Sequence, residues 1–139
     1  MSQAPANALP IEIQLRWSDQ DLLAHVNNAT IMRLAEEARI RALTQLQRSV
    51  GWEGPLDMVL RTAHTEFLRP VMYDDSITIN VWVSRIGNSS FVLQHELVQD
   101  GEICVTIEAV VVAFDADNQA PMPLPDQIRA AFESVLASV

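Results

Sequence analysis

A single long amphipathic helix, followed by four strands with no second helix among them, limits what this chain can fold into. The helix is predicted from about Ala29 to Arg48, because apolar residues recur there at the spacing of one helical face. Most residues on that face are small, so the helix can approach its packing partner closely. On the other side, Glu37 and Arg41 form an i,i+4 pair in the favourable order. The apolar face consists of Ile31, Leu34, Ala35, Ala38, Ala42 and Leu46.

Alternating strand patterns lie on both sides of this helix. Ile11, Ile13 and Leu15 alternate with polar residues and predict a strand before it. The strands after it are joined by short turn sequences, which indicates antiparallel pairing. A short helix is predicted near the end of the chain, with Asp126 as its N-cap. The four later strands are predicted over residues 58–68, 76–85, 91–99 and 103–114.

These elements predict an α+β fold, in which a curved five-stranded antiparallel sheet wraps around one long central helix. One helix cannot cover both faces of a sheet, so the outer face and an edge strand are left exposed. Alternation places Trp82 on that outer face, which favours a partner subunit that covers part of it. Residues 1–8 are small and polar and are expected to form a flexible tail, with residues 9–139 as a single domain.

The composition excludes several functions. A formal charge of −9 argues against binding nucleic acid or anionic membranes, which require clustered Lys and Arg. No secretory signal and no membrane-spanning run is recognised, and the single cysteine, Cys104, permits no internal disulfide. Cys104 lies in an apolar alternating stretch and is predicted to be a small core residue. We therefore expect a cytoplasmic protein.

Polar groups are concentrated where the first strand gives way to the helix. Residues 16–28 read Arg-Trp-Ser-Asp-Gln-Asp-Leu-Leu-Ala-His-Val-Asn-Asn. A helix start presents unpaired N–H groups and a positive dipole potential, which suit a carbonyl oxygen that becomes negative. A carboxylate a few residues upstream can act on the same carbonyl as nucleophile or general base. The segment therefore predicts an acyl-transfer site.

Three motifs in order resemble the hot-dog-fold acyl-CoA thioesterases, in the branch similar to 4-hydroxybenzoyl-CoA thioesterase. The first is Asp-x-Asp-x-x-x-His-Val-Asn-Asn, which ends at Asn28 and precedes an Ala-rich helix that contains Glu-x-Ala-Arg. The second is the run from Thr65 to Asp75, in which an acidic turn follows a Phe-x-x-Pro segment. The third is Gly-Asn-Ser-Ser-Phe over residues 87–91. The resemblance extends from about Ile11 to Phe114.

This resemblance implies a thioester hydrolase that acts on acyl-CoA. Asp21 matches the catalytic carboxylate of the family, and the backbone N–H near Asn28 matches the group that polarises the thioester carbonyl. The family usually assembles this site at a dimer interface, with the coenzyme A phosphates near the surface, so a homodimer or homotetramer is expected. In two places the chain departs from the family, because Ala24 stands where many members have Gly and the hairpin after residue 85 carries little basic charge. The residues expected to bind substrate are Asn27, Arg85, Asn88, Ser89 and Ser90.

Each residue of the first motif also has a structural interpretation. Asp21 can order the loop through its own backbone, and Asp19 can hydrogen-bond within the loop and orient Asp21. His25 can assist proton transfer, contact the ligand or serve only as a hydrogen-bonded structural histidine. Asn27 and Asn28 can be plain cap residues, and a cap positions the same N–H groups that the functional interpretation needs.

No metal or cofactor is predicted. His64 and Glu66 share one face of a strand, but a metal site there would require His25 or His95 nearby, and no tight His or Cys ligand pattern is present. The chain also lacks the Gly-x-Ser-x-Gly nucleophile motif and a Gly-rich phosphate loop, which argues against serine hydrolases and nucleotide hydrolases.

Two other functions compete with thioester hydrolysis. One is the hydration or dehydration of an enoyl thioester on the same fold, although the motifs of those enzymes are not found. The other is a non-catalytic module that binds acyl thioesters, which Ala24 and the weakly basic hairpin favour. Within the hydrolase interpretation, Asp21 as nucleophile and Asp21 as general base are both compatible with the sequence.

Overall fold

The structure is a computed structural model that describes residues 2–54, 56–74 and 76–137. Of the positions named above, Asp75 and the outer ends of the expected tail and domain, Met1 and Val139, lie outside the described residues. No helix in the described part of the chain is long and apolar enough to cross a membrane.

The elements follow the predicted order, with boundaries within two residues or so of the expected ones. A short 3-10 turn, η1, stands between the first strand and the long helix, and a two-residue strand, β6, follows the last long one. In chain order, the elements are β1 (Leu9–Gln14), η1 (Trp17–Asp19), α1 (Asn28–Ser49), β2 (Asp57–Phe67), β3 (Ser76–Ile86), β4 (Ser90–Gln99), β5 (Glu102–Asp115), β6 (Ala120–Pro121) and α2 (Asp126–Glu133).

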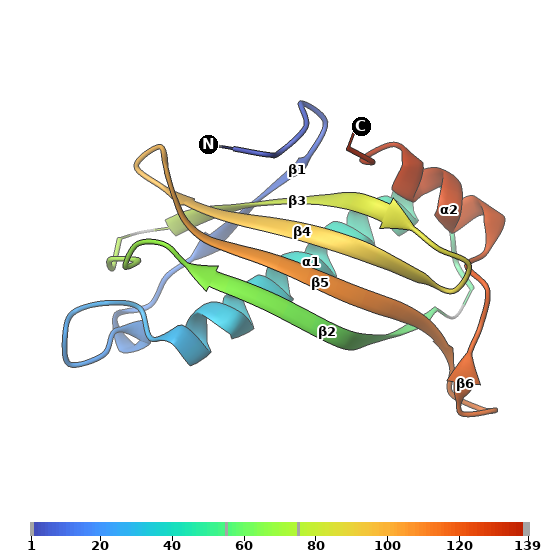
Figure 1. Cartoon of the computed structure of the whole chain (residues 1–139), viewed down its shortest axis with the longest axis horizontal. Helices are drawn as coiled ribbons and strands as arrows, with labels where there is room; N and C mark the ends of the chain where they lie inside the picture. The colour runs from blue at the N-terminus through green and yellow to red at the C-terminus, as the bar shows by residue number, and fades with distance from the viewer. Residues whose placement is uncertain (1, 55, 75, 138–139) are drawn as a thin grey trace.

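The five long strands form one antiparallel sheet in the order β1-β3-β4-β5-β2, and β6 pairs with the end of β5. Helix α1 crosses behind the curved sheet along its length, and α2 lies at the end where β3 turns into β4 (Figure 1). This arrangement confirms the predicted fold class. It places β1 and β2, which both adjoin α1 in the sequence, at opposite edges of the sheet.

Helix α1 packs mainly against β1, β3 and β4 of the sheet and against α2. Its predicted face is buried, and Ala38 and Ala42 are both 0% exposed, so the helix backbone lies close to the sheet. Leu34 is only partly buried, whereas the charged Arg39 is buried within the same face. The Glu37–Arg41 ion pair is confirmed, with a distance of 2.7 Å between its nitrogen and oxygen atoms.

Strand β2 contrasts with its neighbours because nearly every residue along it is exposed or partly exposed. It pairs with β5 on one side only, and a bulge between Leu60 and Thr62 interrupts the register. Its inward-facing residues include Leu60 and Phe67, which are 47% and 46% exposed. Helix α1 therefore leaves this edge of the sheet uncovered.

Two local expectations are wrong, and a third is confirmed. Trp82 does lie on the outer face, but it is only 4% exposed in the single chain. It shares a cleft with Gln3 and Ala137, which belong to the terminal segments that lie at the β1–β3 edge of the sheet (Figure 1). Asp126 is the first residue of α2 rather than its N-cap, which is Pro125. Cys104 is buried as predicted, and burial raises the pKa of its thiol above the usual value, which disfavours the reactive thiolate.

Candidate active site

The loop between β1 and α1 folds back on itself around the carboxylate of Asp21. Asp21 Oδ1 accepts hydrogen bonds from the backbone N–H groups of Leu23, at 2.8 Å, and His25, at 3.3 Å. The backbone N–H of Asp21 donates to the carbonyl of His25 at 2.7 Å and closes the loop. One carboxylate oxygen is thus fixed by the loop, which orients the side chain and leaves Oδ2 for other contacts.

Ala24 occupies the tip of this turn in a left-handed conformation, with φ of 61°. An L-residue pays about 1–2 kcal/mol in this region, and glycine avoids that cost. The backbone N–H of Ala24 bonds to the carbonyl of Asp21 at 3.1 Å, so the turn is closed despite the strain. The chain therefore keeps at Ala24 the backbone geometry for which glycine is the usual residue.

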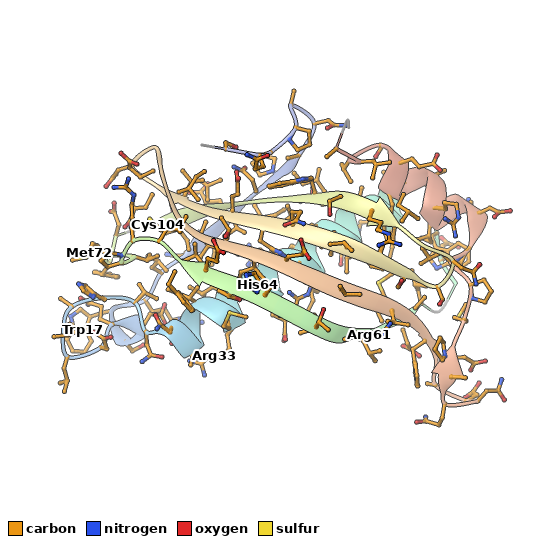
Figure 2. All side chains as sticks on the ribbon, in the orientation of Figure 1. Trp17, Arg33, Arg61, His64, Met72 and Cys104 are labelled. Carbon is orange, nitrogen blue, oxygen red and sulfur yellow. The ribbon has the colours of Figure 1, made fainter. Side chains whose placement is uncertain are left out.

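Two further contacts tie the loop to the segment that follows β2. The N–H of Val26 donates to the carbonyl of Val71 at 2.7 Å, and His25 forms a bridge with Met72. The N–H of Asn27 donates to the carbonyl of Asp19 at 3.0 Å. Trp17, Met72 and Arg33 accordingly lie at one end of the molecule, whereas Arg61 lies toward the other (Figure 2).

Helix α1 begins at this loop with a free backbone donor. Asn27 is the N-cap, and its side-chain oxygen accepts from the N–H of Ala29 at 2.9 Å. The N–H of Ile31 bonds to the carbonyl of Asn27, whereas the N–H of Asn28 has no hydrogen-bond partner within the described part of the chain. The cap therefore leaves the Asn28 amide available at the positive end of the helix dipole.

Asp21 and Asn28 line the same cavity, which has a volume of about 340 Å³. His25 and Asn27 also line it, so four of the residues predicted from the first motif come together here. The opposite wall comes from α1 and from the end of β2 and the segment after it. Its members are Ile31, Phe67, Leu68, Arg69, Pro70 and Val71.

The wall residues were not assigned from the sequence. Phe67 is half-exposed, and Arg69 forms an ion pair with Glu102 at 3.2 Å. These residues fall within the acidic-turn motif that begins at Thr65, but in the sequence analysis that motif only supported the family resemblance. The sequence alone did not show that this motif faces the Asp21 loop, because the backbone contacts between Val26 and Val71 form only in the folded chain.

The hairpin residues predicted to bind substrate lie elsewhere. Ser90 pairs with Val112 of β5, whereas Phe67 at the cavity pairs with Val105, so the hairpin is at the opposite end of the sheet. Figure 1 shows this separation between the β3–β4 turn and the loop before α1. Within one chain, therefore, Arg85, Asn88, Ser89 and Ser90 do not reach Asp21.

The three histidines are also far from forming one site. His64 and Glu66 do approach each other, at 3.5 Å, on an exposed part of β2. His95 is 1% exposed in the core, where its Nδ1 bonds to the carbonyl of Ile107 at 3.2 Å. Burial, with a smaller contribution from nearby Arg39, lowers the pKa of His95 to about 4, so it is neutral at pH 7. Among the residues that the structure describes, no three His, Cys, Asp or Glu side chains are grouped to hold a metal.

The arrangement at the cavity suits attack on a polarised carbonyl. A carbonyl oxygen at the Asn28 amide would be stabilised as it becomes negative, and Asp21 lines the same cavity. The apolar wall at Ile31 and Phe67 can accommodate a hydrocarbon group attached to that carbonyl.

Comparisons with known proteins relate the chain to thioesterases. A family model described as the thioesterase-like superfamily matches residues 15–132. The long-chain acyl-CoA thioesterase FadM of Escherichia coli is 25% identical over 129 residues, which cover 90% of this chain and 97% of FadM. A predicted thioesterase from Bacillus stearothermophilus aligns with a TM-score of 0.82 at 26% identity, over 93% of this chain and 96% of that one. A thioesterase from Thermus thermophilus, in complex with coenzyme A and zinc, aligns with a TM-score of 0.78 at 25% identity, over 100% of this chain and 99% of that one.

Proposed function

The chain belongs to the thioesterase-like superfamily, and on that premise we propose that it hydrolyses acyl-CoA thioesters at the Asp21 cavity. The observation that carries this proposal is that Asp21 and Asn28, whose backbone N–H has no hydrogen-bond partner among the described residues, line one cavity with an apolar wall. The acyl-CoA substrate of FadM and the coenzyme A bound to the Thermus thermophilus thioesterase support the choice of thiol.

In the proposed reaction, the thioester carbonyl oxygen accepts a hydrogen bond from the Asn28 amide. Asp21 then either bonds to the carbonyl carbon itself or removes a proton from a water molecule that does so. The carbon–sulfur bond breaks, and the thiolate leaves and takes up a proton. In the first route a water molecule then hydrolyses the acyl–Asp21 anhydride, so both routes consume one water and yield free acid and thiol.

The other residues of the motif have supporting roles in this proposal. Asn27 caps α1 and so holds the first turn of the helix, and with it the Asn28 amide, in place. One well-placed donor to the oxyanion lowers the activation free energy by about 3 kcal/mol. His25 lines the cavity and fixes the Asp21 carboxylate through its backbone N–H, so its side chain is available to contact the ligand.

The test is a thiol-release screen across aliphatic and aromatic coenzyme A thioesters, with Asp21→Asn and Asp117→Asn variants. Loss of the Asp21 carboxylate should lower kcat/KM by at least about 100-fold, because the nucleophile or base is removed. Asp117 is exposed in the turn between β5 and β6 and does not line the cavity, so Asp117→Asn is the matched control that should retain activity. Near-normal thiol release by a folded Asp21→Asn variant would refute the assignment.

The same screen separates the competing functions. An enoyl thioester that yields free thiol indicates hydrolysis, whereas a hydroxyacyl thioester as product would indicate a hydratase. Tight binding of acyl-CoA without thiol release at any chain length would instead indicate a binding module.

We also propose that the chain works as a homodimer in which the uncovered β2 edges of two copies pair. A long exposed edge strand with apolar residues is normally covered in native proteins. Val112 of β5 pairs with both Ser90 and Val59, so the hairpin lies beside the beginning of β2. In an antiparallel pair, the Phe67 end of one β2 faces the beginning of the other, which would bring Arg85 and Asn88 of the second copy toward the cavity of the first.

A further inference from the structure

A second cavity, of about 680 Å³, lies between α1 on one side and the end of β1 with the start of the following loop on the other, and its α1 lining extends from Thr30 to Arg41. It is separate from the Asp21 cavity, because Thr30 and Arg33 of α1 line it, whereas Asn28 and Ile31 line the other. Its volume falls within the range of about 300–1,000 Å³ that is usual for small-molecule sites. We call it the β1–α1 cleft, and its charged lining residues are Arg16, Asp19, Arg33, Glu37 and Arg41.

The cleft gathers positive charge on a strongly acidic protein. The chain has nine basic residues against a net charge of −9, and three of the nine line this one cavity. They are all arginines, whose planar guanidinium groups match the oxygens of phosphate in a bidentate arrangement. Such local charge can hold an anion even where the overall charge of the protein would repel it.

The two carboxylates of the cleft are already engaged. Glu37 pairs with Arg41 at 2.7 Å, and Asp19 Oδ2 accepts from the backbone N–H of Arg16 at 2.8 Å. Arg33 donates to Thr30 Oγ1 at 3.0 Å. Within the described part of the chain, neither Arg16 nor Arg33 has a carboxylate within ion-pair distance. Two guanidinium groups therefore line the cleft without a neutralising partner.

We propose that the β1–α1 cleft is a phosphate-binding site in which Arg16 and Arg33 are the principal ligands and Arg41 assists. The source of the phosphate rests on the proposed function, because the coenzyme A thioester carries phosphates at the end remote from its sulfur. Arg33 lies five residues beyond Asn28 and Arg41 lies thirteen residues beyond it, which is about 8 and 20 Å along the helix axis. The phosphates would thus bind well away from the scissile bond, while a free phosphate compound would use the same guanidinium groups.

The first test measures binding by calorimetry, with adenosine 3′,5′-bisphosphate and inorganic phosphate as probes. Arg33→Gln and Arg16→Gln should each weaken the binding of the bisphosphate at least 10-fold, and the loss should diminish at high salt because charges are screened. Arg48→Gln is the matched control, since Arg48 is an exposed arginine in the last turn of the same helix. The proposal is overturned if the wild type binds neither probe at millimolar concentration, or if both cleft variants bind as the control does.

A second test identifies the source of the phosphate. Arg33→Gln should raise KM for an acyl-CoA at least 10-fold relative to KM for the same acyl group on pantetheine, which lacks the nucleotide phosphates. If probe binding is lost but this ratio is unchanged, the site is supported and the coenzyme as its ligand is overturned. Calorimetry needs no turnover and can be done with the Asp21→Asn protein. A failure of the proposed hydrolytic activity can therefore be told apart from a failure of the proposed phosphate site.

Discussion

The two halves of the sheet differ in what covers them. Strands β1, β3 and β4 pack on α1, and their inward residues, such as Ile79 and Leu93, are 0% exposed. Strand β2, at the other edge, presents Leu60 and Phe67 half-exposed on its inward side. The covered half contains most of the buried apolar surface and hence most of the stability. The uncovered half meets the Asp21 loop and forms one wall of the candidate active site.

This difference indicates a division of roles. Substitutions in the covered half should change the free energy of unfolding, whereas substitutions in the uncovered half should change assembly and catalysis. The ionisable residues follow the same division, because Arg39 and His95 are buried in the covered half, while His64 and Glu66 are exposed on β2.

The largest expected effect is at the β2 edge. Leu60→Asp should convert the dimer to a monomer and lower activity at least 10-fold, because a charge would be buried at the interface without a partner. Since Leu60 is 47% exposed in the single chain, the monomer should still fold. Sedimentation velocity and circular dichroism measure the two properties.

Ile40→Asp is the control for this change, because Ile40 is 56% exposed but lies on α1. It should leave the dimer intact. A Leu60→Asp protein that sediments as the wild type does would break the proposed link between the uncovered edge and assembly.

An intermediate effect is expected from His95 in the covered half. Burial lowers its pKa to about 4 in the folded state, whereas the unfolded chain binds the proton near pH 6.5. The unfolding free energy should therefore fall as pH drops from 6.5 to 4, by about 3 kcal/mol for this group. Below that window the folded state also takes up the proton, and the loss levels off.

Denaturant titrations at a series of pH values measure this loss. His95→Gln should remove the His95 contribution between pH 6.5 and 4, since glutamine does not titrate. His64→Gln is the control, because the His64 side chain is 76% exposed and should leave the pH profile unchanged. Equal profiles for wild type and His95→Gln would contradict the role assigned to burial.

The smallest effect is expected at Ala24 in the active-site loop. Ala24→Gly should raise the unfolding free energy by about 1 kcal/mol, because glycine adopts a φ of 61° without the steric strain that alanine has there. Thermal unfolding measures the gain. Gln119 has a φ of 52° in a surface turn, so Gln119→Gly tests whether the gain is general or belongs to this loop. A Tm lower than that of the wild type for Ala24→Gly would show that the loop is not strained there.

Much of the fold could be predicted because local hydrophobic periodicity indicates the secondary structure. The alternation in 76–86 and the Ala-rich stripe of α1 predict their elements directly, and short turns predict antiparallel pairing. The burial of Trp82 could not be predicted, because alternation gives the face of a strand but not what the chain ends later cover. Arg39 likewise lies within a buried helical face that its charge alone would not suggest.

About half of the candidate site could be predicted from the sequence. The motif that ends at Asn28 brought Asp21, His25 and the helix start together because they are neighbours along the chain. The wall from Phe67 to Val71 joins them through backbone contacts across more than 40 residues, and no local pattern specifies such a contact. The β1–α1 cleft could not be predicted for the same reason, since Arg16 lies at the start of the loop after β1, whereas Arg33 lies on α1 beyond that loop.

The sequence by itself determined which segments become strands and helix, and where a carboxylate stands relative to a helix start. These properties depend on side-chain spacing within a few residues. Only the tertiary structure decided which edge of the sheet α1 leaves uncovered, which surface completes the cavity, and which arginines face a common cleft. Those properties depend on how the curved sheet and the helix share a limited buried surface, and that is settled only when distant segments pack together.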